Sequence, residues 1–546
     1  MNVSRFRFMR PNPLLANILL FAVLFSISVG IRVDNLRSPI GRGHEWVTAH
    51  TLITLSVYQK GGGPSNFLFA SVVSFDRPAD KYYCSKVAIK DKNNFAYYLS
   101  YPPLCFIMPY YAFKLFDVNA SAAAIRYFGL AIHLVCAFLL FLTVMEFYGK
   151  KIRDDIFLPA FLAAGVYLFG SGNLWFHSNI YFADTLVPLF VISVFLLVVR
   201  AYKNPAKLSS AWFLLVVGLL NFLGTYTEWL QVFFAFAICV CAFIAGFKDR
   251  RFFRLWGVLA FSTLLCIGFT VWQYAGVAGF KNLEAQSVDK YAQRSGRSAD
   301  PEANTAFMSP ESFWAINLHY ERQLKFIMSL AYFSVVVLAG LFILRRNKRA
   351  FIKESVPIWV PMLALFAAIM LHLVIFYNFN CVHDFGTLKT SIFFTLIIGL
   401  AFGAIDKQVK YYHKTVRYIA YTMALGIYVY MISESINKYY SNNNSNQLNG
   451  MHVNVGTMAR IYAKPDELVF APTLTPITTF CAQSLVLTAS STKQAIAFLQ
   501  RIKYSKGIFI DAEDTEEGRI RKVVRITMNG DSTVIVRNYV PPRIDQ

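Results

Sequence analysis

The chain has 546 residues, of which 56% are hydrophobic and 16% aromatic, and its mean hydropathy is +0.44. This composition is too apolar for a soluble domain and predicts a polytopic membrane protein. The formal net charge of +22 lies mostly in short basic clusters between hydrophobic runs, a placement typical of membrane orientation and anionic lipid contact, so nucleic acid is not an expected partner.

The first hydrophobic run covers 13–31 and follows Arg5, Arg7 and Arg10. A secretory signal peptide would look similar. However, the run is long enough to cross a bilayer, and Arg32 follows it without a small-residue cleavage site. We therefore expect a retained first transmembrane helix.

Runs of spanning length recur as far as residue 434 and predict about eleven transmembrane helices. After the first, they cover 124–147, 155–173, 181–199, 209–225, 228–247, 255–274, 324–344, 356–377, 388–405 and 417–434. Every second connection carries a compact basic cluster. The positive-inside rule then places the N-terminus in the cytoplasm and the C-terminus outside. We expect the protein to lie in the inner (plasma) membrane, with its active site and C-terminal domain outside the cytoplasm.

One apolar segment, 102–116, is short and interrupted by prolines. Counting it as a span would move every later basic cluster to the opposite side of the membrane. We therefore expect a helix lying in the outer interface, within a long outer loop over 32–123.

The tail from residue 436 is predicted to be a small α/β domain outside the membrane, after a transmembrane domain over 1–435. A polar linker is expected at 441–446. Helix patterns and strand-like runs alternate after it. The helix patterns cover 451–463 and 491–503, and the strand-like runs cover 467–471, 485–488, 507–510 and 533–538.

Ionisable residues gather at the outer ends of the predicted spans, where charge is costly and usually functional. Glu45, with His44 and His50, follows the first span. The others are His177, Asp184, Glu228, His383, Asp384 and Lys389. They predict an active site that opens toward the outer leaflet. Structural alternatives stay open, because carboxylates at helix starts also cap helices or favour the helix dipole, and interfacial histidines are often only hydrogen-bonded.

The order of these features resembles the C-type fold membrane glycosyltransferases, in the superfamily of protein O-mannosyltransferases and aminoarabinose transferases. Glu45 matches an acidic residue of the first outer loop, on a short juxtamembrane helix. Residues 101–104 (Tyr-Pro-Pro-Leu) are similar to a Lys-Pro-Pro-Leu segment, with Tyr in place of the basic residue. Residues 181–184 (Tyr-Phe-Ala-Asp) are similar to a pattern that runs into Pro-Asp-x-Pro, and 383–385 (His-Asp-Phe) to His-x-Tyr-Tyr.

This resemblance implies inverting transfer of a sugar from a polyprenyl-phosphate donor to a glycan, lipid or protein acceptor outside the cytoplasm. Glu45 would be the general base that deprotonates the acceptor hydroxyl. Most members have Asp at this position, so the reach of the longer Glu side chain differs. The leaving lipid phosphate needs cations or hydrogen-bond donors.

The other roles are assigned more broadly. Asp184 is the second candidate catalytic residue, which would orient the base, contact the sugar or help to hold a cation. The candidates for donor or substrate binding are His44, Tyr101, His177, Glu228, Arg322, His383, Asp384 and Lys389, and further loop arginines are Arg42, Arg294 and Arg297. No spacing forms a recognisable metal motif, so no metal site is predicted, although a divalent cation stays open.

Three other functions compete. A lipid-linked sugar transporter or flippase would favour ionisable groups near the bilayer midplane, but the predicted spans are largely free of charge there. An O-antigen ligase or polymerase usually depends on a late outer loop rich in Arg and His, and the loop at 275–323 has Arg294, Arg297, His319 and Arg322. A purely structural membrane anchor would leave the one-sided acids unexplained.

Overall fold

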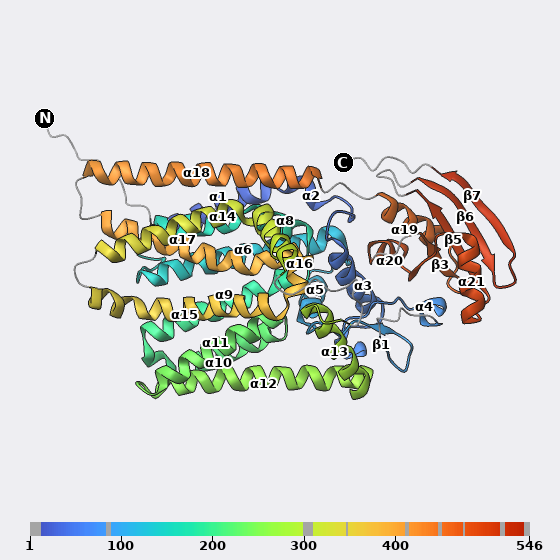
Figure 1. Cartoon of the computed structure of the whole chain (residues 1–546), viewed down its shortest axis with the longest axis horizontal. Coiled ribbons are helices and arrows are strands. Elements are labelled where there is room, and N and C mark those ends of the chain that lie inside the picture. Colours follow the sequence, from blue (N-terminus) through green and yellow to red (C-terminus); the bar gives the residue numbers. More distant parts are fainter. Residues whose placement is uncertain are drawn as a thin grey trace.

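The computed structural model describes residues 12–82, 89–298, 309–344, 348–409, 414–445, 450–472, 476–513 and 519–539. Long, roughly parallel helices form one bundle, and a smaller α/β domain lies beyond one end of it (Figure 1). We call the end of the bundle that faces this domain the domain end. The opposite end carries the predicted basic clusters, and we call it the basic end.

Eight of the described helices contain a stretch long and apolar enough to cross a membrane. They are α1 (Pro13–Gly30), α6 (Ala122–Phe147), α9 (Ala183–Lys203), α11 (Trp229–Gly246), α12 (Arg251–Ala278), α14 (Pro310–Leu344), α15 (Lys348–Ile375) and α17 (Thr387–Val409). The other predicted spans contain α7 (Leu158–Phe169) with α8 (Ser171–Asn179), α10 (Ala211–Thr225) and α18 (Lys414–Ser445). The polytopic class is confirmed, and helices occupy every predicted span.

The predicted span at 155–173 is divided at Gly170, between α7 and α8. A Cβ at this glycine would lie 2.5 Å from the Ile327 side chain, so α14 packs directly against the break. Twelve residues of α7 extend only about 18 Å, less than the hydrocarbon thickness. Both pieces are buried, but only α7 is strongly apolar, whereas α8 carries Ser171, Asn173 and His177.

Short helices cover the domain end of the bundle, where the long outer loop was predicted (Figure 1). The segment predicted to lie in the interface is α5 (Leu104–Leu115), a 12-residue helix with Pro109 inside it. The other elements here are α2 (Val33–Leu36), α3 (Trp46–Lys60), η1 (Pro64–Phe67), α4 (Pro78–Tyr82), the β1 (Ile89–Lys90) and β2 (Ala96–Tyr97) hairpin, α13 (Phe280–Ser295), α16 (Tyr377–Val382) and η4 (Asp384–Gly386).

The α/β domain has one sheet of five strands in the order β4-β3-β5-β6-β7, parallel among the first three and antiparallel beyond β5. The strands are β3 (Leu468–Ala471), β4 (Val486–Thr488), β5 (Lys506–Ala512), β6 (Ile520–Thr527) and β7 (Ser532–Tyr539); the helices are α19 (Gly450–Tyr462), α20 (Pro476–Ala482) and α21 (Thr492–Ile502). The predicted helices and strands of this domain are all present. The sequence did not predict α20 or β6, and β6 has an irregular register between Val523 and Val524 that breaks the two-residue alternation.

The polar segment predicted as a linker, 441–446, does not begin a loop. Helix α18 continues to Ser445, so the boundary predicted at residue 436 lies inside a helix. Tyr439 is fully buried, and its hydroxyl accepts a hydrogen bond of 2.6 Å from Asn35. This contact with α2 extends the helix through a sequence that would favour loop by itself.

The α/β domain docks on α4 and on Arg77 just before it. The backbone N–H of Leu485 donates to the Asp80 carboxylate at 3.1 Å, and Arg77 donates to the Lys464 carbonyl at 2.6 Å. Ala79 is completely buried in the apolar cluster beneath α21. Burial raises the pKa of Asp80 to about 7, against the opposing effect of Arg77.

Candidate functional site

A polar cavity of about 280 Å³ lies at the domain end, between α3, α13, α16 and the segment before α5. The side chains that give the cavity its polarity are His50, Tyr98, Lys290, Gln293, Arg294, Asn378 and His383. Burial lowers the pKa of His50 to about 4 and that of His383 to about 3, so both are neutral near pH 7. The permanent positive charges are therefore Lys290 and Arg294, which suit an anionic ligand.

Aromatic rings hold Arg294 in place. Its guanidinium carbon lies 4.3 Å from the centre of the Tyr101 ring and 5.8 Å from that of Phe379. Stacking of this kind fixes the plane of an arginine while its edge stays available for hydrogen bonds. The sequence predicted Tyr101 as a binding residue, and the structure places it on the cavity wall.

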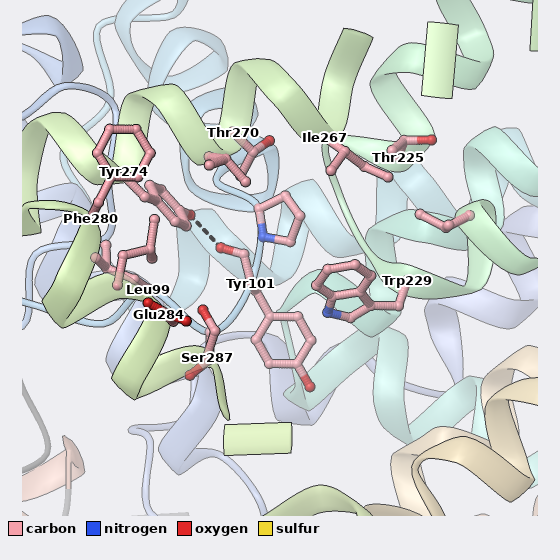
Figure 2. Close-up of a pocket in the computed structure, with 15 residues that line it drawn as sticks. Leu99, Tyr101, Thr225, Trp229, Ile267, Thr270, Tyr274, Phe280, Glu284 and Ser287 are labelled. Carbon is pink, nitrogen blue, oxygen red and sulfur yellow. Dashed lines mark hydrogen bonds between the residues drawn. The ribbon is translucent and has the colours of Figure 1, made fainter. Parts of the chain in front are cut away.

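An apolar cavity of about 260 Å³ adjoins the polar one and shares Tyr101 with it. Figure 2 shows it among α11, α12 and α13, with Trp229, Ile267 and Phe280 among its walls. The hydroxyl of Tyr274 donates a hydrogen bond to the Tyr101 carbonyl. The backbone of Tyr101 is thereby tied to α12, where the apolar and polar cavities meet.

Four buried ionisable side chains from four helices form a cluster near Tyr101. The Lys389 Nζ is 2.7 Å from Asp184 Oδ1, 3.3 Å from Glu228 Oε1 and 2.7 Å from His372 Nε2. Glu228 also accepts a hydrogen bond of 2.8 Å from the N–H of Leu230, so it caps α11 as well. The structure thus brings together three of the predicted site residues, Asp184, Glu228 and Lys389. His372 was missed, although an ionisable side chain inside a predicted span was a usable signal.

The donor set around Lys389 does not fit a metal ion. Among the described residues, no three His, Cys, Asp or Glu side chains are placed to hold one. The lysine ammonium lies between Asp184 and Glu228 and supplies the positive charge that a cation would bring. Removing two buried carboxylates from water is costly without such a partner.

A second cluster lies beside the polar cavity. His44 Nε2 is 3.2 Å from Asp384 Oδ1, and Gln323 donates to Asp384 Oδ2 at 2.7 Å. The His44 side chain is 30% exposed, whereas Asp384 is buried. The His44 ring lies 6.3 Å from the ring of His383, a residue of the cavity wall. His44 has φ +63°, a left-handed conformation that is costly outside glycine and that concentrates at functional sites.

Burial lowers the pKa of His44 below its ordinary value, and the Asp384 carboxylate opposes this effect. The imidazole is therefore neutral near pH 7 and has one lone pair. Either ring nitrogen of the neutral imidazole can carry that lone pair, and Nε2 is the nitrogen that lies near Asp384. Arg322, a predicted donor-binding residue, is exposed on α14 and its charge lowers the pKa of His44 further.

Glu45, predicted as the base, has a different environment. Its side chain is fully buried, and Oε1 is 2.5 Å from the guanidinium of Arg126 on α6. Its other oxygen accepts hydrogen bonds from the backbone N–H groups of Gly41, at 2.6 Å, and Arg42, at 2.8 Å. Neither cavity has Glu45 in its wall. These contacts tie the loop before α3 to α6 and leave the carboxylate little room for a substrate.

His177 also lies apart from the other candidates. It is buried on α8, with its ring stacked on that of His133 at 4.3 Å, and the Tyr167 hydroxyl is 3.3 Å from its Nε2. The Arg32 guanidinium, just after α1, lies 2.9 Å from Nδ1 of His133. Helix α8 therefore uses His177 in the packing of the bundle.

No family model and no curated protein sequence matches the chain. Solved structures do. The oligosaccharyltransferase of Archaeoglobus fulgidus tethered to an acceptor peptide is 12% identical, with a TM-score of 0.57 over 90% of this chain and 68% of that one. ArnT from Cupriavidus metallidurans, bound to undecaprenyl phosphate, is 10% identical, with a TM-score of 0.53 over 92% of this chain and 93% of that one.

The oligosaccharyltransferase AglB from Archaeoglobus fulgidus, in complex with an inhibitory peptide and a dolichol-phosphate, is 11% identical with a TM-score of 0.52, over 90% of this chain and 69% of that one. These likenesses establish the fold. The chain has the architecture of the C-type membrane glycosyltransferases, as the sequence motifs had indicated.

Proposed function

We propose that this protein is an integral membrane glycosyltransferase that moves a sugar, with inversion, from a polyprenyl-phosphate donor to an acceptor hydroxyl. The observation that carries the proposal is the pair of adjoining cavities on either side of Tyr101, one apolar and one with Lys290 and Arg294. An amphiphile with an anionic head and an apolar chain fits this arrangement. Polyprenyl phosphates are bound in the similar structures of ArnT and AglB.

In this proposal the first isoprene units lie against Trp229 and Phe280 in the apolar cavity. The phosphate lies by Arg294 and Lys290, and the sugar points toward His383. The acceptor oxygen attacks the anomeric carbon as the bond from that carbon to the phosphate oxygen breaks. The electron pair of the broken bond stays on the phosphate, where the two cations stabilise it.

The acceptor hydroxyl must lose its proton during this attack. We assign the base to His44, with Asp384 as a positioning residue, in place of Glu45. His44 is partly exposed and has an available lone pair, whereas Glu45 is buried with both oxygens occupied. The chemical class of the acceptor stays open, as in the sequence analysis: a glycan, a lipid or a protein.

The Lys389 cluster has a supporting role. The Lys389 ammonium contacts the carboxylates of both Asp184 and Glu228 and holds the two side chains in place. Zinc is bound in one structure of the Archaeoglobus fulgidus oligosaccharyltransferase. In this chain we propose that the Lys389 ammonium supplies the positive charge beside Asp184 and Glu228, and we propose no metal-dependent step. The domain end faces outward if the basic clusters lie in the cytoplasm.

The test uses Arg294→Gln, with Arg297→Gln as a matched control just beyond the end of the same helix. Native mass spectrometry of the purified full chain measures co-purifying polyprenyl phosphate, and transfer is then measured with the donor so identified. We expect Arg294→Gln to lose bound lipid phosphate and to lower kcat/KM by about 10²- to 10³-fold, while Arg297→Gln behaves like the wild type.

Equal lipid binding and transfer in the two variants would remove Arg294 from the donor site. Flipping of the donor by the purified protein in liposomes, without any transfer product, would instead favour the transporter.

A further inference from the structure

The largest of the three cavities lies at the basic end, far from the candidate active site. It has a volume of about 980 Å³ and is bounded by α6, α14, α15 and α17. This size is at the upper end of the range of small-molecule sites in proteins. The glycosyltransferase proposal makes no use of it.

The cavity exists because two consecutive helices diverge. Helix α14 packs chiefly against α17, whereas α15 packs chiefly against α11. Figure 1 shows α15 apart from α14 in the bundle. Val335 on α14 and Val356 on α15 line the cavity and are about half exposed, at 50% and 44%. The walls are therefore apolar and accessible from the membrane.

The charged residues of the lining gather at one end. Three of them are lysines, Lys150, Lys203 and Lys407, and one is an acid, Asp406. Lys150 follows α6, whereas Lys203, Asp406 and Lys407 lie in the last turns of α9 and α17. The cavity thus combines an apolar shaft with a mouth of excess positive charge.

Neighbouring carboxylates balance part of this charge through weak ion pairs. Lys203 shares Glu146 with Arg200, at 3.7 and 3.1 Å from its two carboxylate oxygens, so one acid serves two cations. Lys150 is 2.9 Å from Asp155, and both side chains are about one-third exposed. Exposed pairs of this kind are weak and exchange partners readily.

We propose that this cavity binds one anionic phospholipid of the leaflet at the basic end, with an acyl chain between α14 and α15 and its phosphate among Lys150, Lys203 and Lys407. Basic pockets between transmembrane helices bind such headgroups in other membrane proteins. The lipid would fill the gap between α14 and α15 and contact both helices, which make little contact with each other. This site is independent of the donor site and of the reaction.

The experiment titrates phosphatidylglycerol or phosphatidylcholine into the delipidated full chain and counts bound lipid by native mass spectrometry. The triple variant Lys150→Gln, Lys203→Gln, Lys407→Gln, called the mouth triple, removes the three lysine charges at the mouth of the cavity. A matched triple variant, Lys151→Gln, Lys207→Gln, Lys248→Gln, removes equal charge from exposed positions of the basic end outside the cavity.

We expect the wild type and the matched triple to bind phosphatidylglycerol tightly, and the mouth triple to bind it about a hundredfold more weakly, because each lysine near a membrane surface contributes on the order of fivefold. Ala404→Trp places an indole inside the cavity without changing charge and should also weaken lipid binding, even if the mouth triple folds poorly. Thermal unfolding checks the fold of each variant.

Four results would overturn the proposal. One is equal binding of phosphatidylcholine and phosphatidylglycerol by the wild type. Another is an equal loss in both triple variants, which would indicate long-range charge only. The third is full binding by Ala404→Trp. A clear preference of this site for undecaprenyl phosphate over phosphatidylglycerol would also contradict the assigned occupant.

Discussion

His44 and Glu45 are adjacent in the chain but have opposite environments. Glu45 points into the protein, where Arg126 and two backbone N–H groups occupy its carboxylate. His44 points toward Asp384 and remains partly exposed beside the polar cavity. Under the proposed assignment, the acid in this loop holds the loop, while its neighbour is the group that reacts. Saturation of hydrogen-bonding capacity separates the two roles.

The largest expected effect is that of His44→Ala. Loss of a general base lowers transfer by about 10²- to 10⁴-fold, with little change in stability, because the imidazole is partly exposed and makes one polar contact. Transfer kinetics, native mass spectrometry of bound donor and thermal unfolding measure the three properties. Transfer at the wild-type rate would exclude His44 as the base.

Glu45→Gln is expected to act on stability instead. The amide leaves the buried Arg126 charge uncompensated, which costs about 3–5 kcal/mol. Thermal unfolding in detergent should show a large drop, and the double variant Glu45→Gln, Arg126→Gln should recover part of it. If the single variant unfolds like the wild type and yet fails to transfer sugar, the comparison reverses and Glu45 is again the candidate base.

Asp384→Asn tests the positioning of His44. We expect a loss of up to about a hundredfold in kcat/KM, since orientation is lost while the base remains. The Asp384 charge raises the pKa of His44. Removing the charge lowers that pKa, so the acid limb of the pH–rate profile moves to lower pH, because the base works in its neutral form. An unshifted acid limb would show that another group titrates.

The smallest effect concerns Asp80, which couples the bundle to the α/β domain. The pKa of Asp80 is raised to about 7 in the docked protein. Between its ordinary value and about pH 7, the undocked form has therefore lost a proton that the docked form retains. Docking should therefore weaken as pH rises from about 4 to 7 and stay constant above.

Hydrogen exchange at 476–488, corrected for its intrinsic pH dependence, measures this docking, since the Leu485 amide donates to Asp80. Asp80→Asn should make the exchange nearly independent of pH. A pH dependence equal to that of the wild type would place the responsible group elsewhere.

Much of the fold could be predicted because its signals are local. A bilayer-length apolar run specifies a helix wherever it lies, and alternation or a 3.6-residue period specified most of the α/β domain. The exceptions have tertiary causes. Gly170 breaks a helix because α14 packs against it, α18 extends because Tyr439 is buried, and β6 was missed because of its irregular register.

The candidate site was predictable in composition but not in pairing. The sequence by itself determined a membrane protein with ionisable groups at one end of its helices, because hydropathy and charge placement are properties of short segments. Only the tertiary structure decided which groups meet. Arg126, 81 residues from Glu45, pairs with that acid, and Lys389 on α17 joins Asp184 on α9 to Glu228 at the start of α11. Such pairings depend on how distant helices pack, and no local pattern in the chain specifies that.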